Sequence, residues 1–183
     1  MFYSKDATQK SYEGLVSRAK SGDTKAFAAI YDAFITRLYR FVYSRVGNRQ
    51  DSEDIVAEVW KSIWESLPRY QSKNFTGFIF RIAYTKIVDY FRNVKHTVCI
   101  DEAVFLADKK KTPEQRVIED EQSEQLKKAL HMIPSMYQSV ITLREIEGFS
   151  VQETAVIIQK SSIAVRVIHF RAMRMLKKLL KDI

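Results

Sequence analysis

The stretch EGFSVQETAVIIQKSSIAVRVIHFRAMRMLKKLLK, residues 147–181, decides the fold prediction. A first helix is predicted over 151–159, in which Ala155 offers a small side chain where two helices can cross closely. A polar break follows at Lys160-Ser161-Ser162, where a serine can cap the next helix. A longer helix is predicted from Ser162 to Lys181. A short helix, a tight turn and a long helix in this order are the layout of a helix-turn-helix.

The long helix is predicted to have an apolar face and a basic face. The apolar positions are Val165, Ile168, Ala172, Met175, Leu176 and Leu179. The basic positions are Arg166, Arg174, Lys177 and Lys181, with Arg171 and Lys178 on the flank. Such a pattern also fits a solvated surface helix, but the preceding small-residue helix and serine break favour DNA binding. Ile163, Val167 and Phe170 should also project outward, where they would meet thymine methyl groups or a protein partner.

Helical periodicity also dominates the N-terminal part, from Tyr12 to Val46. Ser21-Gly22-Asp23 interrupts it, where Asp23 or Thr24 can cap the following helix, and Gly47-Asn48 ends it. A further helix is predicted from Asp51 to about Leu67, before Pro68. Its outer stripe, which by default is a solvated surface, consists of Asp54, Glu58, Lys61 and Glu65.

A polar loop over 69–74 precedes a helix predicted from Phe75 to about Lys95. This helix has more large rings than one buried face needs, so we expect one or two of them to lie exposed. Lys and Arg residues are interleaved with the rings. Periodicity fades from Thr97, and another helix is predicted from Thr112-Pro113-Glu114 to about Met132.

Composition narrows the classes of function. The formal net charge of +8 suggests a polyanionic partner. Two basic segments, 71–100 and 151–183, flank an acidic segment, 101–125. A single cysteine and three dispersed histidines argue against a disulfide or a metal site. No apolar run is long enough for membrane insertion and no signal peptide is visible, so we expect a cytoplasmic protein without cofactors.

An ordered set of motifs resembles the extracytoplasmic-function (ECF) sigma factors of bacterial RNA polymerase. The stretches similar to their second conserved region are Ser21-Gly22-Asp23 with Ala26-Phe27, Leu38-Tyr39-Arg40, Asp51 to Glu58, and Phe75 to Arg92. Those similar to the fourth region are Ile133-Pro134, Leu143 to Ser150, Glu153, Ala155, Lys160-Ser161, Ala164 to Val167, and Arg171-Ala172. The sequence departs from the pattern at Gln159 and Ile163, where glycine is often seen. Thr154 stands where an aliphatic residue is usual.

The resemblance implies an all-α protein with two small helical domains and a flexible linker. Residues 11–96 would form the region 2-like domain, 97–112 the linker, and 113–183 the region 4-like helix-turn-helix domain. The partners implied are promoter DNA, core RNA polymerase (its largest-subunit clamp helices and its flap) and an anti-sigma factor.

The resemblance also implies three sets of contact residues. Core polymerase would be bound by Asp51, Asp54, Ala57, Glu58, Lys61 and Glu65. The opened −10 element would be held as single strand by Arg69, Tyr70, Lys73, Asn74, Phe78, Arg81, Thr85 and Arg92. The −35 duplex would be contacted by Ser161, Ser162, Ile163, Arg166, Val167, Phe170, Arg171, Arg174 and Lys177.

Two other classes of function compete with this interpretation. A stand-alone helix-turn-helix regulator would bind duplex operators without polymerase, but it would not need the aromatic and basic segment 69–92. An enzyme acting on nucleic acid would need clustered carboxylates, metal ligands or a glycine-rich phosphate loop, and no such motif is visible. We therefore expect a sigma factor without catalysis of its own.

Overall fold

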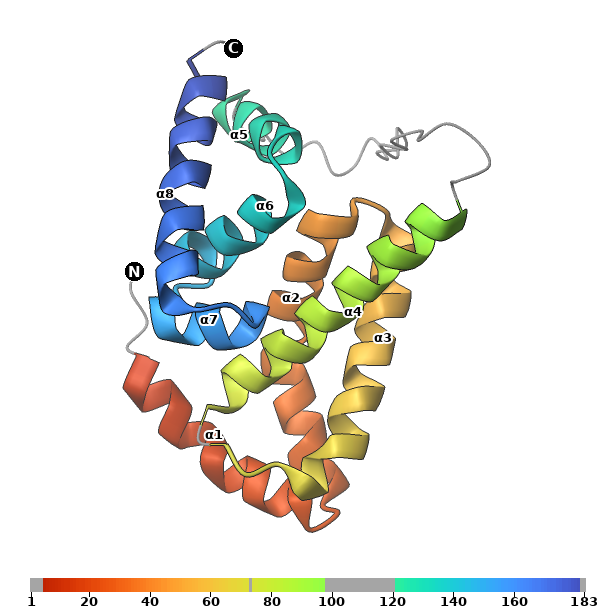
Figure 1. The fold of residues 1–183 in the computed structure, drawn as a ribbon. Coiled ribbons are helices and arrows are strands. Elements are labelled where there is room, and N and C mark those ends of the chain that lie inside the picture. The colour runs from red at the N-terminus through yellow and green to blue at the C-terminus, as the bar shows by residue number, and fades with distance from the viewer. Residues whose placement is uncertain (1–4, 73, 98–120, 182–183) are drawn as a thin grey trace. The chain divides into compact units, whose positions relative to one another are not determined.

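The structure, a computed structural model, describes residues 5–72, 74–97 and 121–181, which form helices and short connections without a β-strand (Figure 1). The chain divides into two compact units, residues 1–105 and 106–183. The predicted all-α class with two helical units is confirmed. Of the predicted linker, only Thr97 is described, at the end of a helix. The boundaries of the linker therefore stay a prediction.

In the described residues of the N-terminal unit, 5–72 and 74–97, there are four helices and one short 3-10 turn. They are α1 (Lys5–Lys20), α2 (Thr24–Val46), α3 (Arg49–Ser66), η1 (Leu67–Arg69) and α4 (Phe75–Thr97). Helix α2 packs against α1, α3 and α4, and α4 also contacts α1 and α3. The largest fully buried side chains of this unit are Ile30, Phe34, Leu38, Phe41, Val42, Ile63, Leu67, Ile79, Phe80 and Ile87. Because α4 is covered by three helices, it buries more than one face.

The ends of α2 follow the predicted signals. The Asp23 side chain accepts hydrogen bonds from the backbone N–H groups of Lys25 and Ala26, both at 3.0 Å. Gly47 ends the helix with a φ of 74°, a conformation that costs glycine little. Helix α3 begins at Arg49, earlier than the predicted start at Asp51, because Asn48 caps it: the Asn48 side chain accepts from the Asp51 N–H at 3.1 Å.

The C-terminal unit is built around the helix-turn-helix. Its elements are α5 (Glu121–Met132), α6 (Ser135–Ile141), the π-helical turn η3 (Thr142–Ile146), α7 (Val151–Ile158) and α8 (Ser162–Leu179). Helix α8 packs against α5, α6 and α7. Part of the core is formed by Ala129, Ile133, Ile141, Ala172 and Leu176. The predicted start of the helix at Thr112 lies outside the described residues.

Side-chain caps fix the geometry of the turn between α7 and α8. Ser150 and Glu153 form a reciprocal capping box at the start of α7. Gln159 ends that helix in the left-handed conformation, with a φ of 55°. The Ser161 hydroxyl then accepts from the Ala164 N–H at 3.1 Å and caps α8. The predicted helix, turn and helix are therefore confirmed to within two residues at each end.

Among the described helices, none combines the length and the apolar character that crossing a bilayer requires.

Candidate nucleic-acid and polymerase interfaces

The basic face of α8 points away from the core of its unit. Val165, Ala172 and Leu176 anchor the helix by their burial. All six cations on the basic face and its flank are exposed, namely Arg166, Arg171, Arg174, Lys177, Lys178 and Lys181. The helix therefore presents a positive outer surface, while its inner face is anchored in the core of the unit.

The outer face of α8 is not purely basic. Ile163 is 71%, Val167 43% and Phe170 69% exposed. They lie within the first nine residues of the helix, next to the turn with α7. Exposure of such large apolar side chains on a rigid helix marks a contact surface.

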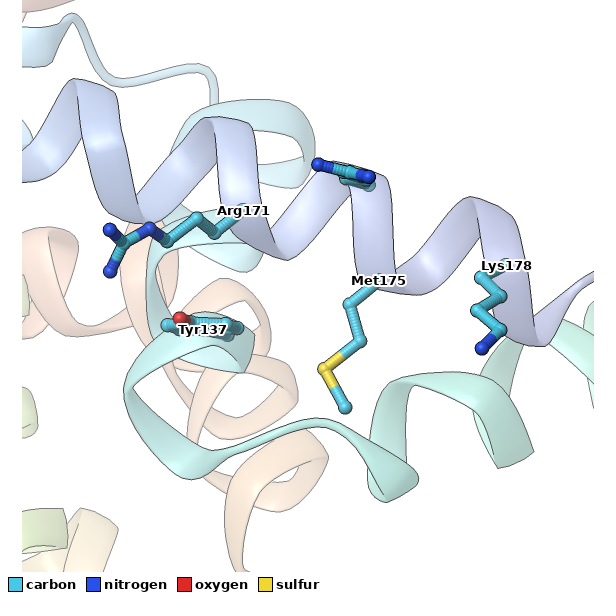
Figure 2. Close-up of a pocket in the computed structure, with 5 residues that line it drawn as sticks. Tyr137, Arg171, Met175 and Lys178 are labelled. Carbon is cyan, nitrogen blue, oxygen red and sulfur yellow. The ribbon is translucent and has the colours of Figure 1, made fainter.

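A shallow groove of about 350 Å³ runs beside this face, between α6 and α8. Tyr137 of α6 forms one side, and Met175 of α8 lies opposite it with Arg171 and Lys178 nearby (Figure 2). Arg174 completes the lining. Met175, which is predicted to lie on the apolar face of the long helix, is 39% exposed, because its position on α8 faces this groove.

The charged stripe of α3 is exposed as its periodicity predicts. Asp54, Ala57, Glu58, Lys61 and Glu65 all lie on the surface. Glu58 forms a salt bridge of 3.2 Å with Lys86 of α4, which offsets the repulsion between Glu58 and Asp54. With three carboxylates and one ammonium group, the stripe is acidic overall.

Asp51, the first residue assigned to the polymerase-binding surface, has its side chain directed toward α4 of the same unit. Its carboxylate accepts a hydrogen bond of 2.7 Å from the Tyr90 hydroxyl. Burial, together with this hydrogen bond and the charge of Asp51, raises the pKa of Tyr90 to about 12. Asp51 is half-buried and ties α3 to α4.

Four of the residues assigned to the −10 strand are exposed, namely Arg69, Arg81, Thr85 and Arg92. Arg92 pairs with Asp89 at 2.8 Å on the same helix, and the Thr85 hydroxyl donates to the Arg81 carbonyl at 3.0 Å. Lys73 lies outside the described residues. The exposed cations of η1 and α4 can meet phosphates without rearrangement of the fold.

The other three residues assigned to this strand stabilise the loop and the start of α4. The Tyr70 ring is buried, 5.3 Å from the Phe75 ring and 4.7 Å from the half-buried Phe78 ring, measured between centroids. Asn74 caps α4 by accepting from the Gly77 N–H at 2.7 Å. The Tyr70 ring is thus not free to stack on a base in this conformation.

The expectation of an exposed ring on α4 is wrong. Each aromatic side chain of this helix is buried or half-buried. The reason is the packing of α4 against α1, α2 and α3, which covers more of its surface than one amphipathic face. A sequence pattern gives the faces of a helix but not the number of its neighbours.

Three residues of these surfaces, Tyr137, Tyr90 and Lys86, are not predicted from the sequence. Tyr137 comes from the short helix α6 and reaches the basic flank only through tertiary packing. Tyr90 and Lys86 are paired with residues of α3 that lie 39 and 28 positions away. No local signal predicts such pairs.

Both units match known families. Residues 30–97 match the family described as Sigma-70 region 2, and residues 123–176 match Sigma-70, region 4. The ECF RNA polymerase sigma factor ShbA of Streptomyces griseus is 30% identical over 177 residues, which cover 90% of this chain and 93% of ShbA. The chain belongs to the ECF sigma factors.

Two further proteins are similar to this ECF sigma factor. BldN of Streptomyces coelicolor is 30% identical over 172 residues, 92% of this chain, and the chain spans 65% of the length of BldN. The solved structure of the sigma factor RpoE of Bartonella quintana, in complex with the anti-sigma factor NepR, has a TM-score of 0.74 at 23% identity. That similarity covers 86% of this chain and 98% of RpoE, and it supports the fold.

The family membership decides between the competing interpretations. An alternative sigma factor directs transcription by RNA polymerase, and sigma factors are non-enzymatic initiation factors. The stand-alone regulator is not favoured, because the N-terminal unit matches sigma region 2 and not a separate interaction domain.

Proposed function

We propose that this ECF sigma factor binds core RNA polymerase in the cytoplasm and contacts promoter DNA through separate surfaces of its two units, without catalysis of its own. The observation that carries the proposal is the outward basic face of α8 in a helix-turn-helix that matches region 4. The free energy for opening the promoter would come from binding to polymerase and to unpaired bases. A site for nucleotide hydrolysis is therefore not needed.

The C-terminal unit would contact the −35 element as duplex. The exposed cations Arg166, Arg171, Arg174 and Lys177 would meet phosphates on the rims of the major groove. Ser161 and Ser162 lie at the start of α8, the end of a recognition helix that approaches base edges. The Ser161 hydroxyl oxygen already accepts the capping hydrogen bond, so a contact with a phosphate oxygen would use the Ser161 O–H or a backbone N–H as the donor.

The N-terminal unit would hold the −10 element as single strand. Arg69, Arg81 and Arg92 are exposed and would meet phosphates, and Thr85 lies among them on α4. Phe78 is half-buried and would form the floor against which an unstacked base packs. Tyr70 and Asn74 would act by fixing the loop and not by contacting the base.

The stripe on α3 would dock on the clamp helices of the largest polymerase subunit. Its acidic members suit a cationic partner, because the stripe stays acidic overall even though Lys86 pairs with Glu58. The C-terminal unit would contact the flap. An anti-sigma factor would compete for these surfaces, and the complex of RpoE with NepR is an example of such a pair.

Reconstituted transcription tests the proposal. Purified chain and core polymerase are incubated with the DNA upstream of the chain's own gene and with promoters found by transcript mapping after forced expression. We expect transcripts with defined start sites that require both components. Failure to produce any such transcript from any of these promoters overturns the proposal.

A further inference from the structure

The first turns of α8 carry an exposed apolar stripe formed by Ile163, Val167 and Phe170. Their exposed fractions of 71%, 43% and 69% mean that nothing in the described part of the C-terminal unit uses these side chains for close packing. At about 1.5 Å per residue, the rise from Ile163 to Phe170 is roughly 10 Å along the helix axis. That length matches about three steps of B-DNA at about 3.4 Å each.

Cations border the stripe on both sides. At about 100° per residue, Arg166 lies roughly 70° to one side of the stripe and Arg171 roughly 70° to the other. Both are exposed. A helix in the major groove has a phosphate strand on each side and base edges in the middle. The order cation, apolar stripe, cation therefore fits duplex DNA, whereas an apolar protein groove would have to leave both guanidinium groups at its rims.

Because the side chains of the stripe are apolar, they can make favourable contact only with an apolar group on a base. Of the four bases, only thymine presents a methyl group in the major groove. Every base pair presents polar atoms there, and covering these atoms without a hydrogen bond is costly. Only the A·T pair also presents a methyl group, whose burial against Ile, Val or Phe can offset that cost.

We infer that Ile163, Val167 and Phe170 determine the sequence preference of the −35 element by contacting thymine methyl groups over three or four successive base pairs. This inference rests on the proposed function of α8 and adds the class of base that it recognises. Arg166 and Arg171 hold the helix between the two strands, and the apolar stripe supplies the selectivity.

Replacement of thymine by uracil tests the inference, because uracil pairs in the same way but lacks the methyl group. Holoenzyme reconstituted from the full chain and core polymerase is bound to a promoter that carries either base within the upstream duplex element. Each contacted methyl should contribute about fourfold to affinity, the effect of removing one such group from water. We expect the uracil promoter to bind more weakly by that factor for each contact.

Variants link the effect to the stripe. Ile163→Ala and Phe170→Ala should weaken binding to the thymine promoter and reduce the thymine-to-uracil ratio. Ile146→Ala is the matched control, since Ile146 is also an exposed apolar side chain, at 62%, but lies on η3 outside the stripe. Its thymine-to-uracil ratio should equal that of the unchanged chain.

Equal binding of the two promoters, or an unchanged ratio in both stripe variants, overturns the inference and leaves a protein partner as the occupant of the stripe. Start-site-specific transcription from the thymine promoter is measured in the same samples. If transcription is specific while the ratio is one, the proposed function stands and only the base assignment fails. If no specific transcript forms, the proposed function itself fails.

Discussion

Thr154 carries a hydroxyl group into the core of the C-terminal unit. The residue is fully buried, and its Oγ1 has no hydrogen-bond partner in the described part of the chain. A buried polar atom without a partner lowers stability, and an apolar side chain of the same shape removes that cost. The sequence itself marks Thr154 as a polar residue at a site where the family usually has an aliphatic one.

We therefore expect Thr154→Val to raise the free energy of unfolding of the C-terminal unit by about 1 kcal/mol. Chemical denaturation followed by circular dichroism measures this. Thr154→Ser is the matched control: it keeps the hydroxyl and loses the methyl, so it should lower stability. A valine variant that unfolds at lower denaturant concentration would show that the hydroxyl has a partner.

Asp23 stabilises the start of α2 through its charge. Hydrogen bonding from the Ala26 N–H, and then from Arg18, lowers the pKa of the Asp23 carboxyl below its ordinary value of 3.8. The unfolded chain therefore binds the proton more tightly. The contribution of Asp23 to stability is fully present above pH 3.8 and is lost as pH falls through the lower folded pKa.

Asp23→Ala should accordingly lower the melting temperature at pH 7, and the difference from the unchanged chain should shrink below pH 3.8. Asp23→Asn, which keeps a capping oxygen, should lower it less at pH 7. Melting curves between pH 2.5 and 7 provide the measurement. A difference that is independent of pH would contradict a role for the carboxylate charge.

Single residues also show where sequence reasoning stops. At Gln159, a position where glycine is often seen, the backbone has a φ of 55°, so the left-handed turn forms although this sequence lacks the glycine that would signal it. Asp51 is predicted to lie on the outer surface, but its contact with Tyr90 lies across two helices. Helical periodicity gives the direction of a side chain and not its distant partner.

Helix α8 has a buried inner face and a charged outer face. If the outer face binds duplex DNA, the affinity should depend on salt concentration, and this dependence can be measured. Arg174→Glu or Lys177→Glu should weaken binding to the upstream duplex. Each lost phosphate contact should also reduce the slope of log affinity against log salt by about 1. Filter binding of holoenzyme at several salt concentrations measures both quantities.

Lys25→Glu is the matched control for these variants, since it makes the same change in net charge at an exposed site on α2. Its salt slope should equal that of the unchanged chain. If Arg174→Glu, Lys177→Glu and Lys25→Glu all give the same slope of log affinity against log salt, the change in affinity reflects net charge alone. The assignment of α8 as the recognition helix then fails.

The helices themselves are largely predictable, since caps, glycines and the 3.6-residue period are local properties. Their packing is not. Helix α4 buries aromatic rings that its sequence pattern does not place on a buried face, because α1, α2 and α3 all pack against it. The groove beside α8 exists only because α6 brings Tyr137 alongside Met175.

In the proposed function, the chain as a whole would join an acidic stripe that binds polymerase to two basic surfaces that bind DNA. Glu58 is the central acid of the stripe, and its side chain is 64% exposed even though it pairs with Lys86. Glu58→Lys places a cation where a cationic partner is expected. We predict that it lowers affinity for core polymerase by about tenfold, which corresponds to about 1.4 kcal/mol.

Competition binding to core polymerase measures this effect, and circular dichroism checks that the helices are retained. Glu13→Lys is the matched control, because it makes the same charge change at an exposed position on α1. Equal loss of affinity in both variants would contradict the assignment of the α3 stripe.

The order of the two units and their classes could be predicted from the motifs, and both family matches agree with that order. The residue-level contacts could be predicted only in part. Exposed cations such as Arg81 and Arg174 follow from helical faces, whereas Tyr70, a predicted DNA contact, is buried among rings contributed by α4.

Chemical footprinting of one promoter, with and without core polymerase, shows whether the chain opens promoter DNA as part of the polymerase. With core enzyme present, we expect protection of the upstream duplex together with permanganate-reactive, unpaired thymines at the −10 element. Without core enzyme, we expect no opened bases. Tight protection by the chain alone, with no opened bases when core enzyme is added, would show instead that it is a stand-alone duplex-binding regulator.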